Sequence, residues 1–383
     1  MKKKIKNILP LGYKANGLSA GIKKSGKPDL CLIISQKPAK ALGLFTANKV
    51  TSGSVKLAQS NLKKSRQFRA IIANSGNANC FTGGNSFIAA KQVVKALAGG
   101  LNINPREILI ASTGIIGQPL PLGRIKKALP ALIKGLSSTG LINAAQAILT
   151  TDTCAKVSAA VINIGGKPVT VCAIAKGAGM IAPNLGYPKA TMLCFILTDA
   201  NISKKVLTAA FARAVEGSFN CITVDGCMST NDCVFLISNS CAGNSVISQQ
   251  GRYFNKFASA LNSLCLDLAK MIIRDAEGAS KFIRIQVKQA KNYNEAKKAA
   301  LSIANSDLFK TAMYGQSHNP GRIVAAVGAS GVEVKEEELK IKISPLNKKN
   351  IFVEVALKQG NAQAIIYTSD LTAEYIKINA QYS

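Results

Sequence analysis

The chain has 383 residues, of which 48% are hydrophobic and 18% are charged, a composition that supports a large buried core and excludes a disordered chain. Its 49 Lys and Arg residues outnumber its 19 Asp and Glu residues, which gives a formal net charge of +30. The basic residues are mostly lysines spread along the whole chain, so we expect solvated lysines and no specific nucleic-acid partner.

The first half of the chain is typical of short aliphatic strands separated by glycine-rich turns. Strand-like runs cover residues 30–35, 70–76, 107–117 and 156–180. The last of these has the pattern of a hairpin around a Gly-Gly turn. Apolar residues at helical spacing predict helices over 86–100 and 120–136, the second one kinked or split at Pro130.

The second half is richer in helical periodicity. Helices are predicted over residues 205–219, 258–281 and 294–315. Residues 282–287 alternate like a strand, and we expect residues 322–331 to be a strand that ends in a glycine turn. Residues 352–372 have the pattern of a second hairpin.

Strands and helices alternate without a strict βαβ rhythm, which predicts the fold class. The pattern favours an α/β or α+β layered sandwich with mixed sheets over a doubly wound fold. We expect a main domain over residues 1–281 and a smaller C-terminal α/β domain over residues 282–383.

The cysteines and the single histidine do not form a recognisable site. The ten cysteines are scattered, and several lie in apolar, strand-like runs. Zinc requires clustered Cys and His ligands, so we expect no metal, and buried thiols in a reducing cytoplasm are the better interpretation. A Ser-His-Asp triad would need His318, which we expect in a surface turn. No apolar run reaches the roughly 18–20 residues of a membrane helix, so no membrane association is predicted.

Four loops combine glycine with small hydroxyl or amide residues. They are NSGNANCFTGG (74–84), STGIIG (112–117), AKGAGMIAPN (175–184) and VDGCMSTND (224–232). Each alone is typical of an ordinary turn. The stretch ATML places Thr191 before an apolar run, where either a strand begins or the chain is cut. A cut there would free an α-amine with an ordinary pKa of ~7.7–8.0, which could act as the base for the Thr191 hydroxyl without any histidine.

Taken together and in order, these strings resemble the ornithine acetyltransferase family of arginine biosynthesis, whose members are often also glutamate N-acetyltransferases. The further strings that carry the resemblance are TTDT, TDA, EGASK and DLTAEYIKINA. The resemblance implies self-cleavage between Ala190 and Thr191 into an α chain (1–190) and a β chain (191–383). It also implies an α2β2 heterotetramer in the cytoplasm. The fold that it implies is α/β, an αββα-like catalytic sandwich of two mixed β-sheets covered by helices, with a smaller C-terminal α/β domain.

The activity that the resemblance implies is acetyl transfer through an acetyl-Thr191 intermediate. Thr191 takes the acetyl group from N2-acetylornithine and passes it to glutamate in a ping-pong cycle, giving ornithine and N-acetylglutamate. No cofactor is implied, and acetyl-CoA is a candidate second acetyl donor for glutamate.

The same resemblance assigns roles to individual residues. The oxyanion hole falls on Thr113 and Gly114, where a hydroxyl and a backbone N–H in one tight turn can point at the same oxyanion. Lys176 suits a substrate carboxylate, and Glu277 suits an ammonium group. The implied substrate contacts are Thr151 (or its neighbour Thr150), Lys176, Thr191, Glu277, Asn379 and Ser383.

The sequence departs from the family pattern beside the cut, where residues 186–189, GYPK, lengthen the stretch before ATML. Cys227, Met228 and Cys233 also replace the Asp, the Thr and the hydroxyl residue expected in the family's loop. Two alternatives stay open. One is a related self-processing amidohydrolase or aminopeptidase, which would pass the acyl group to water. The other is a basic binding protein on a decayed enzyme fold, which would bind RNA with a steep salt dependence.

Overall fold

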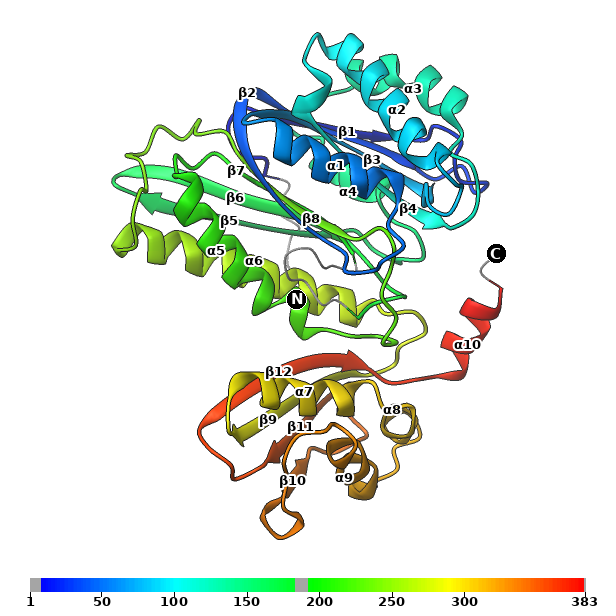
Figure 1. Ribbon diagram of the computed structural model, residues 1–383, viewed down its shortest axis with the longest axis vertical. Helices are drawn as coiled ribbons and strands as arrows, with labels where there is room; N and C mark the ends of the chain where they lie inside the picture. The colour runs from blue at the N-terminus through cyan, green and yellow to red at the C-terminus, as the bar shows by residue number, and fades with distance from the viewer. Residues whose placement is uncertain (1–7, 183–191, 382–383) are drawn as a thin grey trace. The chain divides into compact units, whose positions relative to one another are not determined.

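The computed structural model of the chain describes residues 8–182 and 192–381. These residues divide into two compact units (Figure 1). The larger unit comprises Met1–Gly177, Pro183–Asn220 and Met228–Leu268, and the smaller unit comprises Ala178–Ala182, Cys221–Cys227 and Ala269–Ser383. The smaller unit therefore contains the C-terminal region and two short segments from earlier in the chain.

The larger unit is built on eight hydrogen-bonded strands. Seven of them follow in the order β4-β3-β2-β8-β7-β6-β5, and the eighth, β1, pairs with β2. Its elements in chain order are β1 (Tyr13–Leu18), β2 (Leu30–Phe45), α1 (Gly53–Lys64), β3 (Phe68–Asn77), α2 (Asn85–Leu101), β4 (Ile108–Ile115), α3 (Leu122–Lys134), α4 (Leu141–Ala147), β5 (Lys156–Ile164), β6 (Lys167–Lys176), β7 (Leu193–Thr198), α5 (Lys204–Glu216), β8 (Cys233–Ser238) and most of α6 (Arg252–Arg274). The hairpin predicted over 156–180 is confirmed as β5 and β6, and its second strand ends at Lys176. The sequence prediction missed α1 and α4.

Strand β2 belongs to two sheets, and this makes the unit a sandwich. Its first part pairs with β3 through residues 30–34, and its second part pairs with β8 through residues 40–45. Pro38 lies between the two parts, where the ladder shifts register, because proline has no N–H to donate to a ladder. Two mixed sheets therefore share β2, as the sequence predicts for the fold class.

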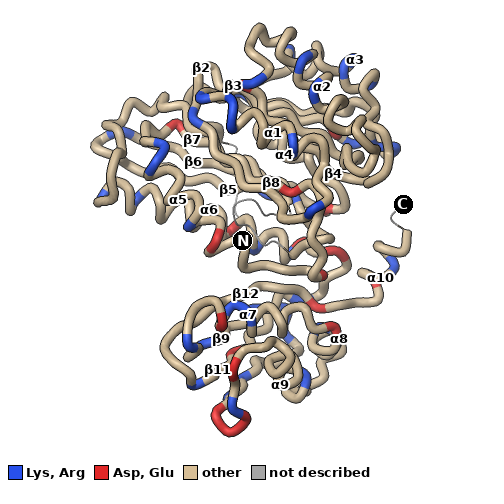
Figure 2. The backbone as a smooth tube through the Cα atoms, in the orientation of Figure 1, with Lys and Arg blue, Asp and Glu red and all other residues tan. Residues whose placement is uncertain are grey.

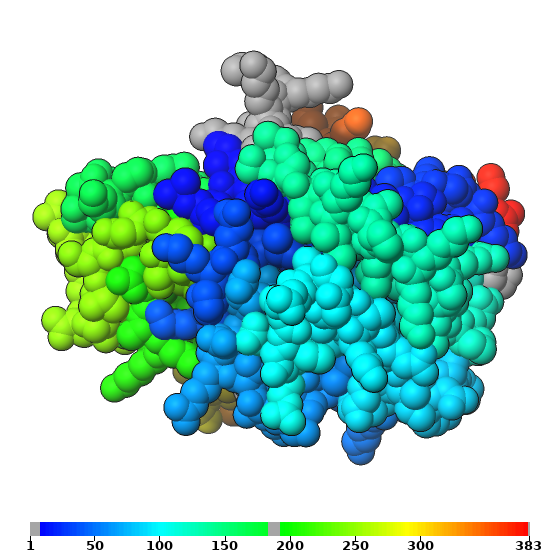
Figure 3. Space-filling view, turned by 90° about the horizontal axis from the view of Figure 1, so that it is seen from above, coloured from blue at the N-terminus to red at the C-terminus, as the bar shows by residue number. Residues whose placement is uncertain are grey.

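The first sheet contains β1, the first part of β2, β3 and β4, and the second contains the last part of β2 with β8, β7, β6 and β5. Alternate residues of the first sheet face two different cores. The inner core joins both sheets and holds Cys31, Ile33, Ile71, Ala73, Leu109 and Ala111 with Ile174, Phe195 and Phe235. The outer core lies under α2 and α3 and holds Leu30, Leu32, Ala70, Ile72, Ile108 and Ile110. The strand period of two thus places helices on one face and the second sheet on the other. Helices α2 and α3 pack side by side (Figures 1 and 3), and α5 and α6 cover the far face of the second sheet.

The smaller unit has a 4-stranded sheet in the order β10-β11-β9-β12. Its elements are the end of α6, β9 (Phe282–Ala290), α7 (Tyr293–Ala304), α8 (Asp307–Tyr314), α9 (Pro320–Gly328), β10 (Lys340–Ile343), β11 (Asn350–Ala356), β12 (Ala362–Ser369) and α10 (Ala373–Ala380). The prediction of a hairpin over 352–372 is wrong. Strand β9 lies between β11 and β12 and pairs with β11 in parallel and with β12 in antiparallel orientation.

Two further predictions in this unit need correction. The prediction of a strand over 322–331 is wrong, because these residues lie mostly in α9, with Pro320 in its first turn and Ile323, Ala326 and Val327 buried at helical spacing. The single helix predicted over 294–315 is divided into α7 and α8. The division occurs because the Ser306 hydroxyl accepts from the Phe309 N–H and caps α8.

Helix α3 lies within the helix predicted over residues 120–136, and most of the cysteines are buried, as predicted. Pro130 lies inside α3, which continues on both sides of it. All ten cysteines are free, and seven of them are buried, namely Cys31, Cys80, Cys172, Cys194, Cys221, Cys233 and Cys265. Lys and Arg residues are scattered over the helices and loops of each unit (Figure 2). Within residues 8–182 and 192–381, no helix is long and apolar enough to cross a bilayer.

Candidate active site

Two of the glycine-rich loops lie at the end of the first sheet where β3 and β4 terminate. Strands β3 and β4 are parallel and pair from Ala70–Ile108 to Gly76–Gly114, so the loops at their carboxyl ends are neighbours. Buried hydrogen bonds hold these loops. The Ser112 hydroxyl donates to Asn74 Oδ1 at 2.7 Å, and Asn231 Nδ2 donates to the Ser112 carbonyl at 2.8 Å. The fold therefore brings the STGIIG turn together with NSGNAN and with the STND part of the fourth loop.

The predicted oxyanion residues lie at the end of β4. Gly114 has a φ of +133°, and a Cβ there would collide with the Gly76 carbonyl carbon, so this position requires glycine. Thr113 is half-buried, and its Oγ1 accepts a hydrogen bond from Lys176 Nζ at 3.3 Å. An ammonium group has no acceptor, so Thr113 must direct its own hydroxyl proton elsewhere. That arrangement suits a hydroxyl that donates to an oxyanion.

Lys176 ends β6 and is held next to a buried carboxylate. Asp152 Oδ1 accepts from the Gly177 N–H at 2.7 Å and from Lys156 Nζ at 2.6 Å. Burial would raise the pKa of the Asp152 carboxyl, but Lys176, Lys156 and the Gly177 N–H outweigh burial and lower it to about 2. Asp152 is therefore ionised at neutral pH, and it fixes the backbone directly after Lys176.

The positive charge near this carboxylate exceeds its negative charge. Lys156 is fully buried, and Lys23, in the loop after β1, interacts electrostatically with both Asp152 and Lys176. Burial and the Lys176 charge lower the pKa of Lys23 to about 8, against the opposing effect of Asp29 and Asp152. Such a cluster favours an added anion such as a substrate carboxylate.

The two threonines left open by the sequence have different surroundings. The Thr150 N–H donates to Asp152 Oδ2 at 3.1 Å, and its hydroxyl lies 3.5 Å from the same oxygen. Thr150 thus helps to hold Asp152. Thr151 is half-buried in the same loop. This division of contacts favours Thr151 over Thr150 as a substrate residue.

Two predicted substrate residues meet in the smaller unit. Glu277 follows α6, and its carboxylate accepts from Asn379 Nδ2 at 2.9 Å. The Glu277 N–H donates to the Ala178 carbonyl at 3.0 Å. Gly278 has a φ of +64°, and a Cβ there would collide with the Tyr375 nitrogen. The chain turn at Gly278 therefore places Glu277 beside α10.

Three of the predicted site residues, Ala190, Thr191 and Ser383, lie outside the described residues. His318 is exposed, as the sequence predicts. Sequence analysis did not single out Lys23 or Lys156. The spacing of Asp152 and Lys156, four residues apart, was the available signal for the buried ion pair.

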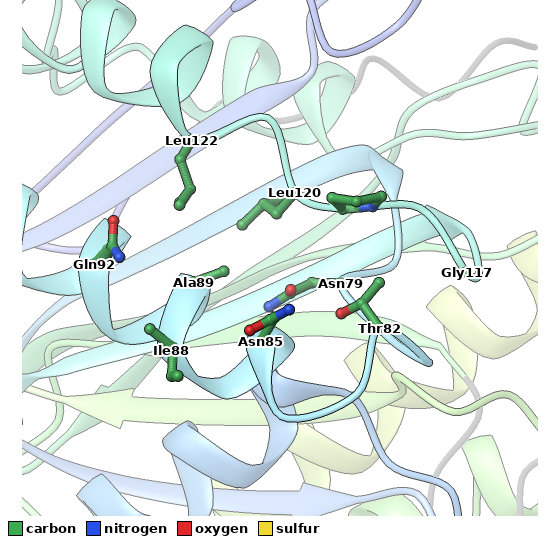
Figure 4. Close-up of a pocket in the computed structure, with 10 residues that line it drawn as sticks. Asn79, Thr82, Asn85, Ile88, Ala89, Gln92, Gly117, Leu120 and Leu122 are labelled. Atoms are coloured by element: carbon green, nitrogen blue, oxygen red, sulfur yellow. The ribbon is translucent and has the colours of Figure 1, made fainter.

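A cavity of about 420 Å³ opens beside the chain that follows the STGIIG turn (Figure 4). Its walls include Asn79, Ile88 and Gln92 on one side and Gly117 and Leu120 on the other. Asn79 is fully buried, and among the described residues its Oδ1 has no hydrogen-bond partner. The side of the turn that carries Gly117 is therefore open, whereas the side that carries Gly114 is packed against β3.

This difference between the two glycines gives a testable prediction. Gly117→Ala is expected to lower the free energy of unfolding by about 1 kcal/mol, because φ is +88° but no atom lies within 4 Å of the new Cβ. Gly114→Ala is expected to cost clearly more, since it adds a collision with Gly76. Urea unfolding of both variants checks this. Equal losses would show that the close approach of β3 to Gly114 does not matter.

Comparisons with known proteins show the family of the chain. The ArgJ family model matches residues 14–383. The chain is 42% identical over 392 residues to the arginine biosynthesis bifunctional protein ArgJ of Geobacter sulfurreducens, covering 97% of this chain and 98% of that protein. It is 43% identical over 406 residues to the glutamate N-acetyltransferase of Methanocaldococcus jannaschii, covering 98% and 97%. The solved arginine biosynthesis bifunctional protein argJ of Bacillus halodurans is 33% identical, with a TM-score of 0.44 over 46% of this chain and 92% of that chain.

The family model and the two nearly full-length matches define an acyltransferase of arginine biosynthesis. The chain belongs to the ArgJ family. The family resemblance stated from the sequence motifs is thereby confirmed.

Proposed function

We propose that this protein is a glutamate N-acetyltransferase that moves an acetyl group from N2-acetylornithine to glutamate and matures by cleaving itself between Ala190 and Thr191. The contact of Lys176 Nζ with Thr113 Oγ1 at 3.3 Å carries the proposal. It puts a cation suited to a substrate carboxylate beside a hydroxyl suited to an oxyanion. The 43% identity to a relative named glutamate N-acetyltransferase, and the 42% identity to a bifunctional protein of arginine biosynthesis, support the choice of substrates.

The transfer consists of two balanced half-reactions at Thr191. In the first, the Thr191 oxygen attacks the acetyl carbonyl carbon while its proton passes to the free α-amine. The Thr113 hydroxyl and the Gly114 N–H stabilise the oxyanion. The amide C–N bond then breaks, the proton passes to the departing nitrogen, ornithine leaves, and the acetyl group stays on Thr191 as an ester. In the second, the glutamate amine attacks the ester carbonyl carbon, the C–O bond to Thr191 breaks, and a proton from the attacking amine passes through the α-amine to the Thr191 oxygen.

The substrates differ in their side chains but share a carboxylate. In our proposal Lys176, with Lys23 nearby, binds that carboxylate, and Thr151 lies in the adjoining loop. Glu277, held by Asn379, binds the side-chain ammonium of ornithine. Ser383 completes the set of substrate contacts.

The organisation of the mature protein follows from the same proposal. Cleavage yields chains 1–190 and 191–383, which stay together as an α2β2 heterotetramer in the cytoplasm. Their domains are the catalytic sandwich over 1–281 and the C-terminal domain over 282–383. Acetyl-CoA is a further donor in the proposal, and no resident cofactor takes part.

The test is to follow ornithine, N-acetylglutamate and acetate after N-acetylornithine is mixed with the purified protein, with and without glutamate. We expect ornithine and N-acetylglutamate in equal amounts, and neither product from Thr191→Ala. Acetate in place of N-acetylglutamate would indicate the hydrolase instead. No turnover together with steeply salt-dependent RNA binding would indicate the binding protein.

A further inference from the structure

The carboxylate of Asp225 gathers hydrogen bonds from three separate segments of the smaller unit. Its Oδ2 accepts from the Met180 N–H at 2.6 Å and from the Tyr375 hydroxyl at 3.2 Å. Its Oδ1 accepts from the Ile181 N–H at 2.9 Å and from the Cys227 N–H at 3.1 Å. A single half-buried side chain thus joins residues 180–181, its own loop and α10.

The segment that Asp225 holds is also tied down by its neighbours. The Ile181 carbonyl accepts from the Val224 N–H at 2.6 Å and from the Thr223 hydroxyl at 3.0 Å. Met180 has a φ of +52°, which is unfavourable for a residue with a side chain. Contacts from outside the segment must offset that strain, and Asp225 supplies two of them at consecutive backbone N–H groups.

The same segment supports Glu277. The Ala178 carbonyl accepts the Glu277 N–H at 3.0 Å. A Cβ on Gly179 would collide with the Glu277 carboxylate, so the glycine lets that carboxylate lie directly against the backbone. The position of residues 178–181 therefore sets the position of Glu277.

We propose that Asp225 is a positioning residue that anchors residues 178–181, and through them both the start of the segment leading to Ala190–Thr191 and the Glu277 carboxylate. The inference rests on the proposed function for its link to self-cleavage. The cut would leave residues 178–181 on the α chain and Asp225, Glu277 and Tyr375 on the β chain. The hydrogen bonds of Asp225 to Met180 and Ile181 would then hold the two fragments together.

The anchor should speed self-cleavage and tighten substrate binding for one physical reason. When the chain that leads to a reactive peptide bond is fixed at one end, that bond samples fewer unproductive arrangements. Glu277 likewise binds an ammonium group better when its backbone does not move. Neither effect requires Asp225 to touch the reacting atoms.

The test compares Asp225→Asn with two control variants. The amide nitrogen of asparagine cannot accept a hydrogen bond, so Asp225→Asn leaves either the Met180 N–H or the Ile181 N–H without its acceptor. We expect self-cleavage to slow by about 10- to 100-fold. In the cleaved protein KM for N-acetylornithine should rise more than kcat falls. Tyr375→Phe, which leaves all three backbone bonds to Asp225, and Asp307→Asn, which removes an exposed acid of the same unit, should each stay within about threefold of wild type.

Hydrogen exchange at Met180 and Ile181 separates this inference from the proposed function. We expect both amides to be protected in the wild-type chain and at least one of them to lose protection in Asp225→Asn, whether or not either chain is cleaved. If wild type is not cleaved, the proposed function fails, while loss of protection still supports the anchor. Retained protection, unchanged cleavage with unchanged KM, or an Asp225→Asn chain that does not fold would overturn the positioning role.

Discussion

Thr113→Ala is expected to lower the kcat of acetyl transfer by about 100- to 1,000-fold, because it removes one of the two donors proposed for the oxyanion. Thr113 is half-buried at the end of β4, and alanine fits the same backbone, so the fold should persist. Lys176 loses its contact with the hydroxyl, but Asp152 still holds the chain at Gly177. The rate should be measured per molecule of fragment that begins at Thr191, so that slow maturation is not mistaken for slow transfer.

Thr113→Ser is the matched control for this variant. Serine keeps the hydroxyl that accepts from Lys176 and donates to the oxyanion, so most of the kcat should return. If Thr113→Ala has the kcat of wild type, Thr113 is not an oxyanion donor. If serine is as slow as alanine, the methyl group and its packing matter more than the hydroxyl.

Asp152→Asn is expected to lower the free energy of unfolding by roughly 3–5 kcal/mol, because it removes the charge of the carboxylate that contacts the buried ammonium of Lys156. Neither side chain of this pair is exposed, and their charged atoms are 2.6 Å apart. The Gly177 N–H and Lys176 also lose an ionised partner. Denaturant unfolding measures the loss.

An exposed pair of similar length provides the control. Lys288 and Glu354 are 2.7 Å apart on the sheet of the smaller unit, with 38% and 34% of their side chains exposed. Glu354→Gln should therefore change the free energy of unfolding by no more than about 1 kcal/mol. Equal losses in Asp152→Asn and Glu354→Gln would show that burial does not set the value of the Asp152 pair.

The pH dependence of the Asp152 effect has a definite sign. The folded pKa of about 2 lies below the ordinary value of 3.8, so ionised Asp152 stabilises the fold fully above about pH 4. This stabilisation is lost as the pH falls through about 2. The difference in stability between wild type and Asp152→Asn should therefore narrow over that range of pH. A difference that stays constant would contradict the lowered pKa.

The sequence predicts the parts of the fold that depend on local pattern. Short runs of consecutive apolar residues indicate the strands β3 and β4, and the Gly-Gly turn indicates the β5–β6 hairpin. The β11–β12 error has a non-local cause, because β9 comes much earlier in the chain and lies between the two strands. Helix α9 was missed because its apolar run resembles a strand until the spacing of its buried residues is known.

The site divides in the same way. Motifs identify Thr113 and Lys176, but they are 63 residues apart, and only the sandwich shows that their side chains touch. Lys23 belongs to no motif, and its effect depends on the burial that the fold imposes. Asp225 lies in a recognised loop, but its bonds to Met180 and Ile181 span 45 and 44 residues.

Thr191 as the self-generated nucleophile is the central claim, and denaturing intact mass spectrometry before and after addition of N-acetylornithine tests it most directly. We expect two fragments, one ending at Ala190 and one beginning at Thr191. Only the second should gain the mass of one acetyl group, and it should lose that mass when glutamate is added. Thr191→Ala should give one uncut chain with no added mass. A single uncut wild-type chain of 383 residues, or an acetyl group on any other residue, would contradict the account.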